Sequence, residues 1–280
     1  MDARFILVVN ARSGSFDEDT VETILATAGE HGLGPVAQLS IPDDACPCAQ
    51  DLPDDAVLAI YAGDGTCNSV IAGLDGWDGS VLILPGGTMN LASKRMHGEA
   101  GWENILGRFA RGEARTTRGP LIRTPHGNAV AGVMAGPGAT WNEVREAMRD
   151  RDLPGMARRA VEAFRATDDG ANIVLDLAPL DRIEGYPMIE ALADESGLEI
   201  NAYHADDAGE FAIGLGALLL RHFRSGPHDS AITQESVRIR SVDGLPIGLL
   251  LDGEPVPASP EMELSLVASK VDLLTTRQDD

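Results

Sequence analysis

Two glycines flank an acid in the segment Ala62-Gly63-Asp64-Gly65-Thr66, a combination suited to holding a phosphate. The apolar run before it, residues 57–61, is typical of a strand buried on both faces. After it, apolar residues recur at helical spacing, at Cys67, Val70, Ile71 and Leu74. Glycines let backbone N–H groups approach a ligand, and a helix start favours negative charge. Because a carboxylate repels phosphate unless a cation lies between them, Asp64 indicates bound Mg²⁺. The alternative is a tight turn in which Asp64 or Thr66 caps the helix.

Two further turns that follow apolar runs also contain glycines and polar side chains that could contact a phosphate or a nucleotide. The first spans residues 10–15, and taken alone it is better explained as a polar loop that caps a helix. The second spans residues 85–90 and is equally well explained as a strand-to-helix turn or as a ligand site. The residues that these two turns could present to a nucleotide are Asn10, Ser13, Gly14, Gly86, Gly87, Thr88 and Asn90.

A second pair of acids occurs far along the chain, in Asp252-Gly253-Glu254. Asp-Gly between two strands is a common hairpin turn, so a structural role explains the pattern well. The functional interpretation is that a tight turn holds two carboxylates, one of which acts as a general base.

The first 115 or so residues alternate strand and helix patterns, which predicts a parallel sheet with helices on both faces. Strands are expected at residues 5–9, 35–41, 57–61 and 81–84, and helices after the first and third of these and at 102–111. Ligands of such sheets bind beyond the carboxyl ends of the strands. The three turns fall at such ends, which favours one shared site.

The remainder of the chain is dominated by short strand patterns separated by Asp-Gly turns, which predicts a mostly antiparallel β-sandwich domain. A helical insertion is expected at 141–164, and a second helix at 210–223. Expected strands include 129–133, 172–177 and 247–251. We expect an α/β nucleotide-binding domain at residues 1–118 and a β-rich domain at 119–280, ending in a frayed tail from Thr276.

Composition narrows the classes of function. The 280 residues carry a net charge of −22, which argues against non-specific nucleic-acid binding and against simple electrostatic attraction to anionic membranes. The three cysteines (Cys46, Cys48 and Cys67) give no disulfide framework, so reduced thiols in a cytoplasmic protein are expected. No apolar stretch is long enough to span a bilayer, and contact with the inner membrane would therefore be peripheral. The six histidines show no metal-ligand spacing and are expected at the surface or in loops. Oligomeric state has no signature in the sequence.

Taken together, four motifs resemble the diacylglycerol kinase catalytic family, which includes bacterial lipid kinases and sphingosine kinases. In chain order they are Asn-x-x-Ser-Gly at 10–14, Gly-Asp-Gly-Thr at 63–66, Pro-x-Gly-Thr-x-Asn at 85–90 and Asp-Gly-Glu at 252–254. The resemblance implies an α/β nucleotide domain, a β-sandwich domain and an active site between them. It implies an ATP- and magnesium-dependent phosphotransferase that acts on a lipid hydroxyl.

The resemblance also assigns roles. Residues 10–14 would lie against ATP, and Ser40 would approach the nucleotide from the second strand. The segment Gly63, Asp64, Gly65 and Thr66 would cradle the phosphates and the Mg²⁺, and Thr88 would bind phosphate or ribose. Glu254 would take the proton from the lipid hydroxyl, with Asp252 close by, and transfer would be in line.

Two departures from the family pattern leave other functions open. Ser69 stands where many members have an acid, and Leu91 stands where diacylglycerol kinases usually have an aspartate. The acceptor is therefore expected to be a diacylglycerol-like or long-chain-base lipid. An NAD kinase, which shares Gly-Asp-Gly-Thr, is the second hypothesis. A nucleotide- or lipid-binding regulator with impaired catalysis is the third.

Overall fold

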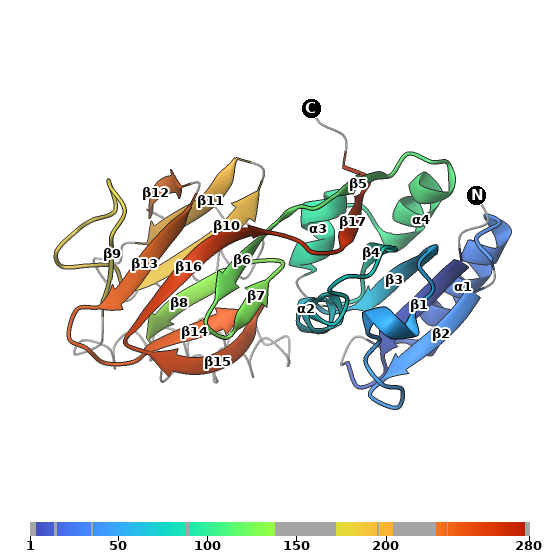
Figure 1. The fold of residues 1–280 in the computed structure, drawn as a ribbon, viewed down its shortest axis with the longest axis horizontal. Helices are drawn as coiled ribbons and strands as arrows, with labels where there is room; N and C mark the ends of the chain where they lie inside the picture. Colours follow the sequence, from blue (N-terminus) through green and yellow to red (C-terminus); the bar gives the residue numbers. More distant parts are fainter. Residues whose placement is uncertain are drawn as a thin grey trace. The chain divides into compact units, whose positions relative to one another are not determined.

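A computed structural model of the chain describes residues 4–13, 16–34, 36–87, 90–137, 172–194, 196–203, 228–233 and 235–277 (Figure 1). The chain divides into two compact units, the first comprising Met1–Gly119 with Ala268–Asp280 and the second Pro120–Val267. This differs from the expected division, which placed every residue after 118 in the second domain. The end of the chain instead returns to the first unit.

The first unit is built on one six-stranded sheet with strand order β2-β1-β3-β4-β17-β5. Its strands are β1 (Arg4–Asn10), β2 (Val36–Ile41), β3 (Ala56–Ala62), β4 (Ser80–Pro85), β5 (Arg115–Thr117) and β17 (Asp272–Thr275). All neighbouring pairs are parallel except β17 with β5. In register, Ala62 pairs with Pro85 and Tyr61 with Val9. The carboxyl ends of β1, β3 and β4 therefore meet at one edge, as the alternating pattern predicted.

Helices pack on both faces of this sheet. They are α1 (Glu18–Glu30), α2 (Asp64–Ala72), α3 (Leu91–His97) and α4 (Trp102–Ala110), with a short 3₁₀ helix η1 (Ala49–Asp51). One face packs against α1 and α4 through a core that includes Leu7, Ile24 and Ile105. The alternate residues of β1, β3 and β4 are buried on the other face, and α2 and α3 contact β3 and β4.

The start of α1 shows how local sequence sets an element. Asp17 is in an extended conformation, and its carboxylate accepts a hydrogen bond from the Thr20 N–H, as expected of an N-cap. Val21, Ile24 and Ala28 then recur at helical spacing and are buried.

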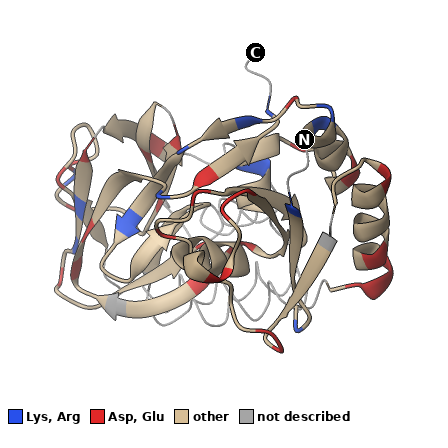
Figure 2. Cartoon of the chain, turned by 45° about the vertical axis from the view of Figure 1, so that its right-hand side comes forward, with Lys and Arg blue, Asp and Glu red and all other residues tan. Residues whose placement is uncertain are grey.

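Acidic positions outnumber basic ones across both units in Figure 2, as the net charge requires.

The return of the chain end corrects two expectations. Thr276, expected to begin a frayed tail, is buried, and its backbone N–H donates to Nδ1 of His97 at 3.2 Å. His97, expected at the surface, is 3% exposed. Burial lowers the pKa of the His97 imidazole to about 4, so the ring is neutral and Nδ1 can accept this bond. The strand β17 that precedes Thr276 lies between β4 and β5.

The second unit is a sandwich of two sheets. One has the order β12-β11-β10-β8-β14-β15 and the other β7-β6-β16-β13-β9. The strands are β6 (Pro120–Thr124), β7 (Gly127–Ala129), β8 (Val133–Pro137), β9 (Ile173–Leu175), β10 (Met188–Asp194), β11 (Gly197–Tyr203), β12 (His228–Thr233), β13 (Ser236–Ser241), β14 (Ile247–Leu251), β15 (Glu254–Ser259) and β16 (Glu261–Ala268). Strand pairs with a defined register in this unit are antiparallel, as predicted.

One apolar core joins the two sheets, with Ile200 and Leu249 from the first sheet and Ile239 and Leu264 from the second. The strand expected at residues 129–133 is wrong, because the structure breaks it at 130–132 between β7 and β8. The helices expected at 141–164 and 210–223 lie outside the described residues.

The three cysteines, all within the described part of the chain, form no disulfide bond. Among the residues that the structure describes, no helix combines the length and apolarity needed to cross a membrane.

Candidate functional site

The candidate site of the first unit consists of the turns that follow β1, β3 and β4. The turns after β3 and β4 pack directly on each other, because Gly86 and Gly87 have no side chain. A Cβ on Gly86 would fall 2.5 Å from the Ala62 nitrogen, and one on Gly87 would fall 2.6 Å from the Gly63 Cα. Both distances are too short for real atoms, so glycine is required at these two positions. The close approach that these glycines permit in the structure is between the two turns, and their expected contact with a nucleotide stays a prediction.

Asp64 joins the same two turns through hydrogen bonds. It is the first residue of α2, yet its carboxylate accepts from the start of α3: Oδ2 from the Leu91 N–H at 3.1 Å and Oδ1 from the Ala92 N–H at 2.8 Å. The first N–H groups of a helix have no partner within the helix, and a carboxylate there also benefits from the helix dipole. Asp64 thus serves as a cap for a helix that begins 27 residues later.

Burial dominates the electrostatics of Asp64. The side chain is 9% exposed, and desolvation raises the pKa of its carboxyl group. The hydrogen bonds from Ala92 and Leu91 and the charge of Lys94 act in the opposite direction. Lys94 is one of only two lysines in the chain, and its side chain is 19% exposed and lies 3.4 Å from the Glu99 carboxylate. Sequence reasoning did not select Lys94, although the rarity of lysine here was a usable signal.

The starts of α2 and α3 differ. Asp64 caps α3, whereas α2 begins after Gly63, which has no side chain to cap it. Thr66 and Cys67 donate their N–H groups to the Gly63 carbonyl. The positive end of the nine-residue α2 dipole therefore lies at a glycine turn, an arrangement that suits an external anion.

Asn10 connects the turn after β1 to this arrangement. Its amide Nδ2 donates to the Thr66 hydroxyl at 3.0 Å, and its Oδ1 accepts from the Arg12 N–H at 3.0 Å. In the turn after β4, Asn90 has a left-handed backbone (φ 54°), and its Oδ1 accepts from the Gly87 N–H. Both asparagines that were expected to contact nucleotide thus shape their turns.

The remaining predicted residues of the first unit have local partners. Ser13 donates its N–H to the Asn10 carbonyl, and the Gly65 carbonyl accepts from the Ser69 hydroxyl. Ser40 lies in β2, where its N–H donates to Asp44 and its hydroxyl accepts from Gln38. Gly14 and Thr88 lie outside the described residues.

The acidic turn of the second unit is a two-residue hairpin that joins β14 to β15. Asp252 (φ 49°) and Gly253 (φ 82°) are both left-handed, as the turn chemistry of Asp-Gly predicts. Asp252 is 6% exposed, and its carboxylate accepts three backbone hydrogen bonds, from Val130 (2.9 Å), Ala131 (2.7 Å) and Gly132 (3.0 Å). These bonds hold the backbone of residues 130–132 out of strand geometry, which explains the break between β7 and β8.

Glu254 differs from Asp252 in exposure. It is the first residue of β15, opposite Leu251, and its side chain is exposed. The structure therefore separates the two acids: Asp252 fixes the turn to the 130–132 segment, and Glu254 is presented to solvent.

The donor set suits a magnesium ion carried by a nucleotide better than a metal held by protein alone. In the described parts of the chain, no group of three or more His, Cys, Asp or Glu side chains gathers to hold a metal. Mg²⁺ in phosphotransfer sites usually takes one or two carboxylates, with phosphates and water completing the shell. Each Asp64 oxygen has a lone pair beyond the one that accepts from α3, so Asp64 can fill such a role.

Part of the chain is similar to a known domain family, and the chain as a whole is similar to solved structures. Residues 4–118 match the family model of the diacylglycerol kinase catalytic domain. A provisionally assigned diacylglycerol kinase from Bacillus anthracis strain Sterne has a similar fold, with a TM-score of 0.67 and 13% identity over 96% of both chains. A second structure with the same assignment, also from Bacillus anthracis strain Sterne, has a TM-score of 0.66 and 13% sequence identity over 97% of both chains. No curated protein matches the sequence significantly.

Residues 4–118, which make up most of the first unit, thus resemble the diacylglycerol kinase catalytic domain, and the resemblance that the motifs indicated is confirmed for this part of the chain. At 13% identity, the solved structures establish the shared fold only.

Proposed function

We propose that this chain is an ATP-dependent lipid kinase that transfers the γ-phosphate to a hydroxyl of a diacylglycerol-like or long-chain-base lipid. The observation that carries the proposal is the difference between the two helix starts in the matched domain. Asp64 neutralises the start of α3, while the start of α2 is left at Gly63 without a side-chain cap. That position suits a nucleotide phosphate.

Each turn has a distinct part in this proposal. Gly86 and Gly87 bring the turn after β4 onto the turn after β3, so that both shape one surface. Asn10 orients the Thr66 hydroxyl beside it. Lys94 adds positive charge near Asp64. Mg²⁺ bound with the nucleotide would neutralise phosphate charge, and Asp64 is the residue that would hold it.

The second unit would supply the proton chemistry. Glu254 is exposed and would accept the proton of the acceptor hydroxyl as the oxygen attacks the γ-phosphorus. Asp252 would act as a positioning residue, because its three backbone hydrogen bonds determine where the turn presents Glu254. Catalysis would then depend mainly on positioning and charge neutralisation.

The test is phosphate transfer from labelled ATP with Mg²⁺ to a panel of lipids in detergent micelles and to NAD. We expect labelled lipid, and a loss of about 100-fold or more in kcat for Glu254→Gln and for Asp64→Asn. Glu263→Gln is the matched control, because Glu263 is an exposed carboxylate of β16 in the same unit as Glu254.

Two results would replace the proposal with one of its alternatives. Labelled NADP would identify an NAD kinase. Nucleotide binding without transfer to any acceptor in a broad panel would identify a regulator, in keeping with Leu91 in place of the family's aspartate.

A further inference from the structure

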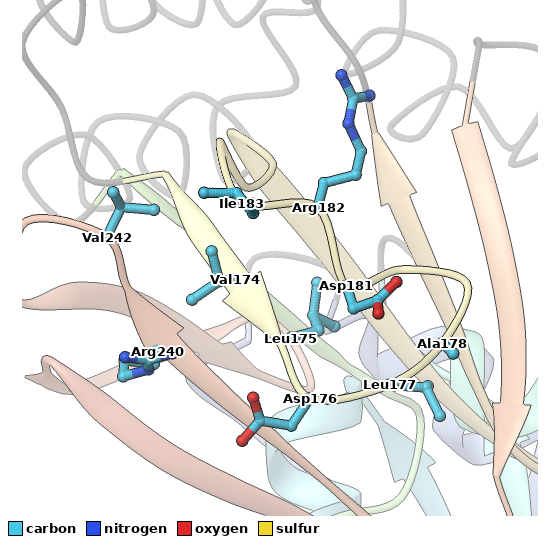
Figure 3. A pocket seen from close by; sticks show the side chains of 10 residues that line it. All are labelled: Val174, Leu175, Asp176, Leu177, Ala178, Asp181, Arg182, Ile183, Arg240 and Val242. Atoms are coloured by element: carbon cyan, nitrogen blue, oxygen red, sulfur yellow. The ribbon is translucent and has the colours of Figure 1, made fainter.

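A pocket of about 630 Å³ lies in the second unit (Figure 3). It is formed by edge strand β9, the loop that follows it, and the end of β13. Val174 faces it, and Arg240, the cross-strand neighbour of Val174, lies beside it. The described residues that line it are Val174, Leu175, Asp176, Leu177, Ala178, Asp181, Arg182, Ile183, Arg240 and Val242.

The rim of this pocket exposes large apolar side chains. Ile183 is 90% exposed and Val242 is 52% exposed, and both line the same pocket as Val174 (Figure 3). Leu245 does not line the pocket, but it follows Val242 by three residues in the same loop and is 51% exposed. Among the described residues, the other large apolar side chain with comparable exposure is Ile232. Single exposed apolar residues are ordinary, but a group on the rim of one pocket indicates an interaction surface.

The charges of the pocket are balanced, unlike those of the whole chain. Two aspartates (Asp176 and Asp181) and two arginines (Arg182 and Arg240) line it, whereas the chain carries a net charge of −22. Arg182 is held in place by Glu184 at 2.8 Å and lies over the Tyr186 ring at 5.5 Å. A zwitterionic phospholipid headgroup has the matching pair of charges, because its phosphate complements arginine and its ammonium complements aspartate.

We propose that this pocket and its rim form the surface by which the chain docks on a bilayer of zwitterionic phospholipid. Ile183, Val242 and Leu245 enter the boundary between headgroups and acyl chains, and the arginines and aspartates bind headgroups around them. The choice of a bilayer as partner rests on the proposed function, since a lipid kinase must meet an acceptor that resides in one. Apolar insertion provides the affinity that a strongly acidic chain cannot obtain from anionic lipid.

The experiment measures co-sedimentation of the full chain with phosphatidylcholine vesicles at 0.1 M and 1 M NaCl. We expect wild-type partitioning to change by less than about twofold with salt, because apolar insertion rather than attraction between net charges provides the affinity. Ile183→Asp combined with Val242→Asp should lower partitioning by about tenfold or more. Ile232→Asp is the matched control, since Ile232 is 55% exposed on β12 and does not line the pocket, and it should bind as the wild type does.

Three results would overturn the proposal. The first is absence of wild-type binding to the vesicles. The second is an equal loss for Ile232→Asp and for the double variant. The third is sedimentation-velocity evidence that the wild-type chain self-associates and the double variant does not, because a second copy would then cover this surface.

The binding assay separates this inference from the proposed function, because it requires no turnover. Vesicle binding by wild type and by Asp64→Asn, with no transfer to any lipid, would support docking and reject the kinase. Transfer to lipid in micelles without vesicle binding would support the kinase and reject docking on this surface.

Discussion

Asp64 in the first unit and Asp252 in the second are both buried, both adjoin a glycine in a tight turn, and both accept hydrogen bonds from backbone N–H groups of a distant segment. They differ in what they hold. Asp64 caps α3, whereas the start of α2, of which Asp64 is the first residue, has no side-chain cap. Asp252 takes three N–H groups of an irregular bend and has an exposed acid two residues later. An acid beside glycine can therefore serve a site indirectly, by fixing the backbone that presents other groups.

The largest expected effect concerns how much Asp252 and Asp64 each contribute to the free energy of unfolding. Asp252→Ala removes the acceptor of three backbone hydrogen bonds and places alanine at a left-handed φ, so we expect a loss of about 3–5 kcal/mol in the free energy of unfolding. Asp64→Ala removes the acceptor of two backbone hydrogen bonds, and we expect a loss of about 2–3 kcal/mol in the free energy of unfolding. Urea unfolding of both variants measures the difference.

Asp252→Asn provides the control for that prediction. Asparagine tolerates positive φ and keeps one acceptor oxygen, so it should retain more stability than alanine does. If Asp252→Ala were no less stable than Asp64→Ala, the backbone hydrogen bonds would not be the main contribution of Asp252.

A second comparison between the units concerns buried titratable groups. Glu190 in β10 is 3% exposed, and its Oε2 accepts from Tyr203 at 3.1 Å and from Asn201 at 3.3 Å. Desolvation raises its carboxyl pKa to about 7 in spite of these bonds. Because the pKa of Glu190 is higher in the folded than in the unfolded state, the contribution of this residue to stability is fully present below pH 4.5 and is lost as the pH rises through 7. His97 in the first unit has a lowered pKa, so its contribution is lost as the pH falls from 6.5 towards 4.

Glu190→Gln tests this contrast. The amide keeps an acceptor for Tyr203 and Asn201 and carries no charge, so the variant should be about 2–3 kcal/mol more stable than wild type at pH 8 and nearly equal at pH 4.5. Unfolding free energies at several pH values provide the measurement, with Glu263→Gln as control, because Glu263 is an exposed carboxylate of β16 that does not contribute to the Glu190 pKa. An equal gain at both pH values would show that charge burial is not the cause.

The sequence was informative where a pattern is local and silent where a partner is distant. The apolar runs of β1, β3 and β4 and the Asp252-Gly253 turn could be predicted because their causes lie within a few residues. Helix α3 was missed because its seven residues include Lys94, Arg95 and His97 and its cap lies 27 residues earlier. The bend at 130–132 was missed for the same reason, since Asp252 lies about 120 residues away.

The candidate site divides in the same way. The residue types and strand-end positions of the three turns were predictable from glycines and polar side chains. Their mutual contacts were not, because the close approach of Gly87 to Gly63 depends on strand register, which a single sequence does not reveal.

The smallest expected effect concerns the link between two of these turns. Asn10→Ala removes the donor to the Thr66 hydroxyl, and Thr66→Val removes the acceptor, so each should cost about 1 kcal/mol of unfolding free energy. The double variant should cost less than the sum, because the same bond cannot be lost twice, and a double-mutant cycle from urea unfolding gives the coupling. Ser69→Ala is the control, since the Ser69 hydroxyl bonds only one turn back to Gly65 on an exposed helix face, and its effect should be close to zero. Additive losses for Asn10→Ala and Thr66→Val would mean that the two turns are held together by their backbones alone. A coupling of about 1 kcal/mol would show that Asn10, selected from the sequence as a nucleotide contact, also fixes the turn in which Thr66 lies.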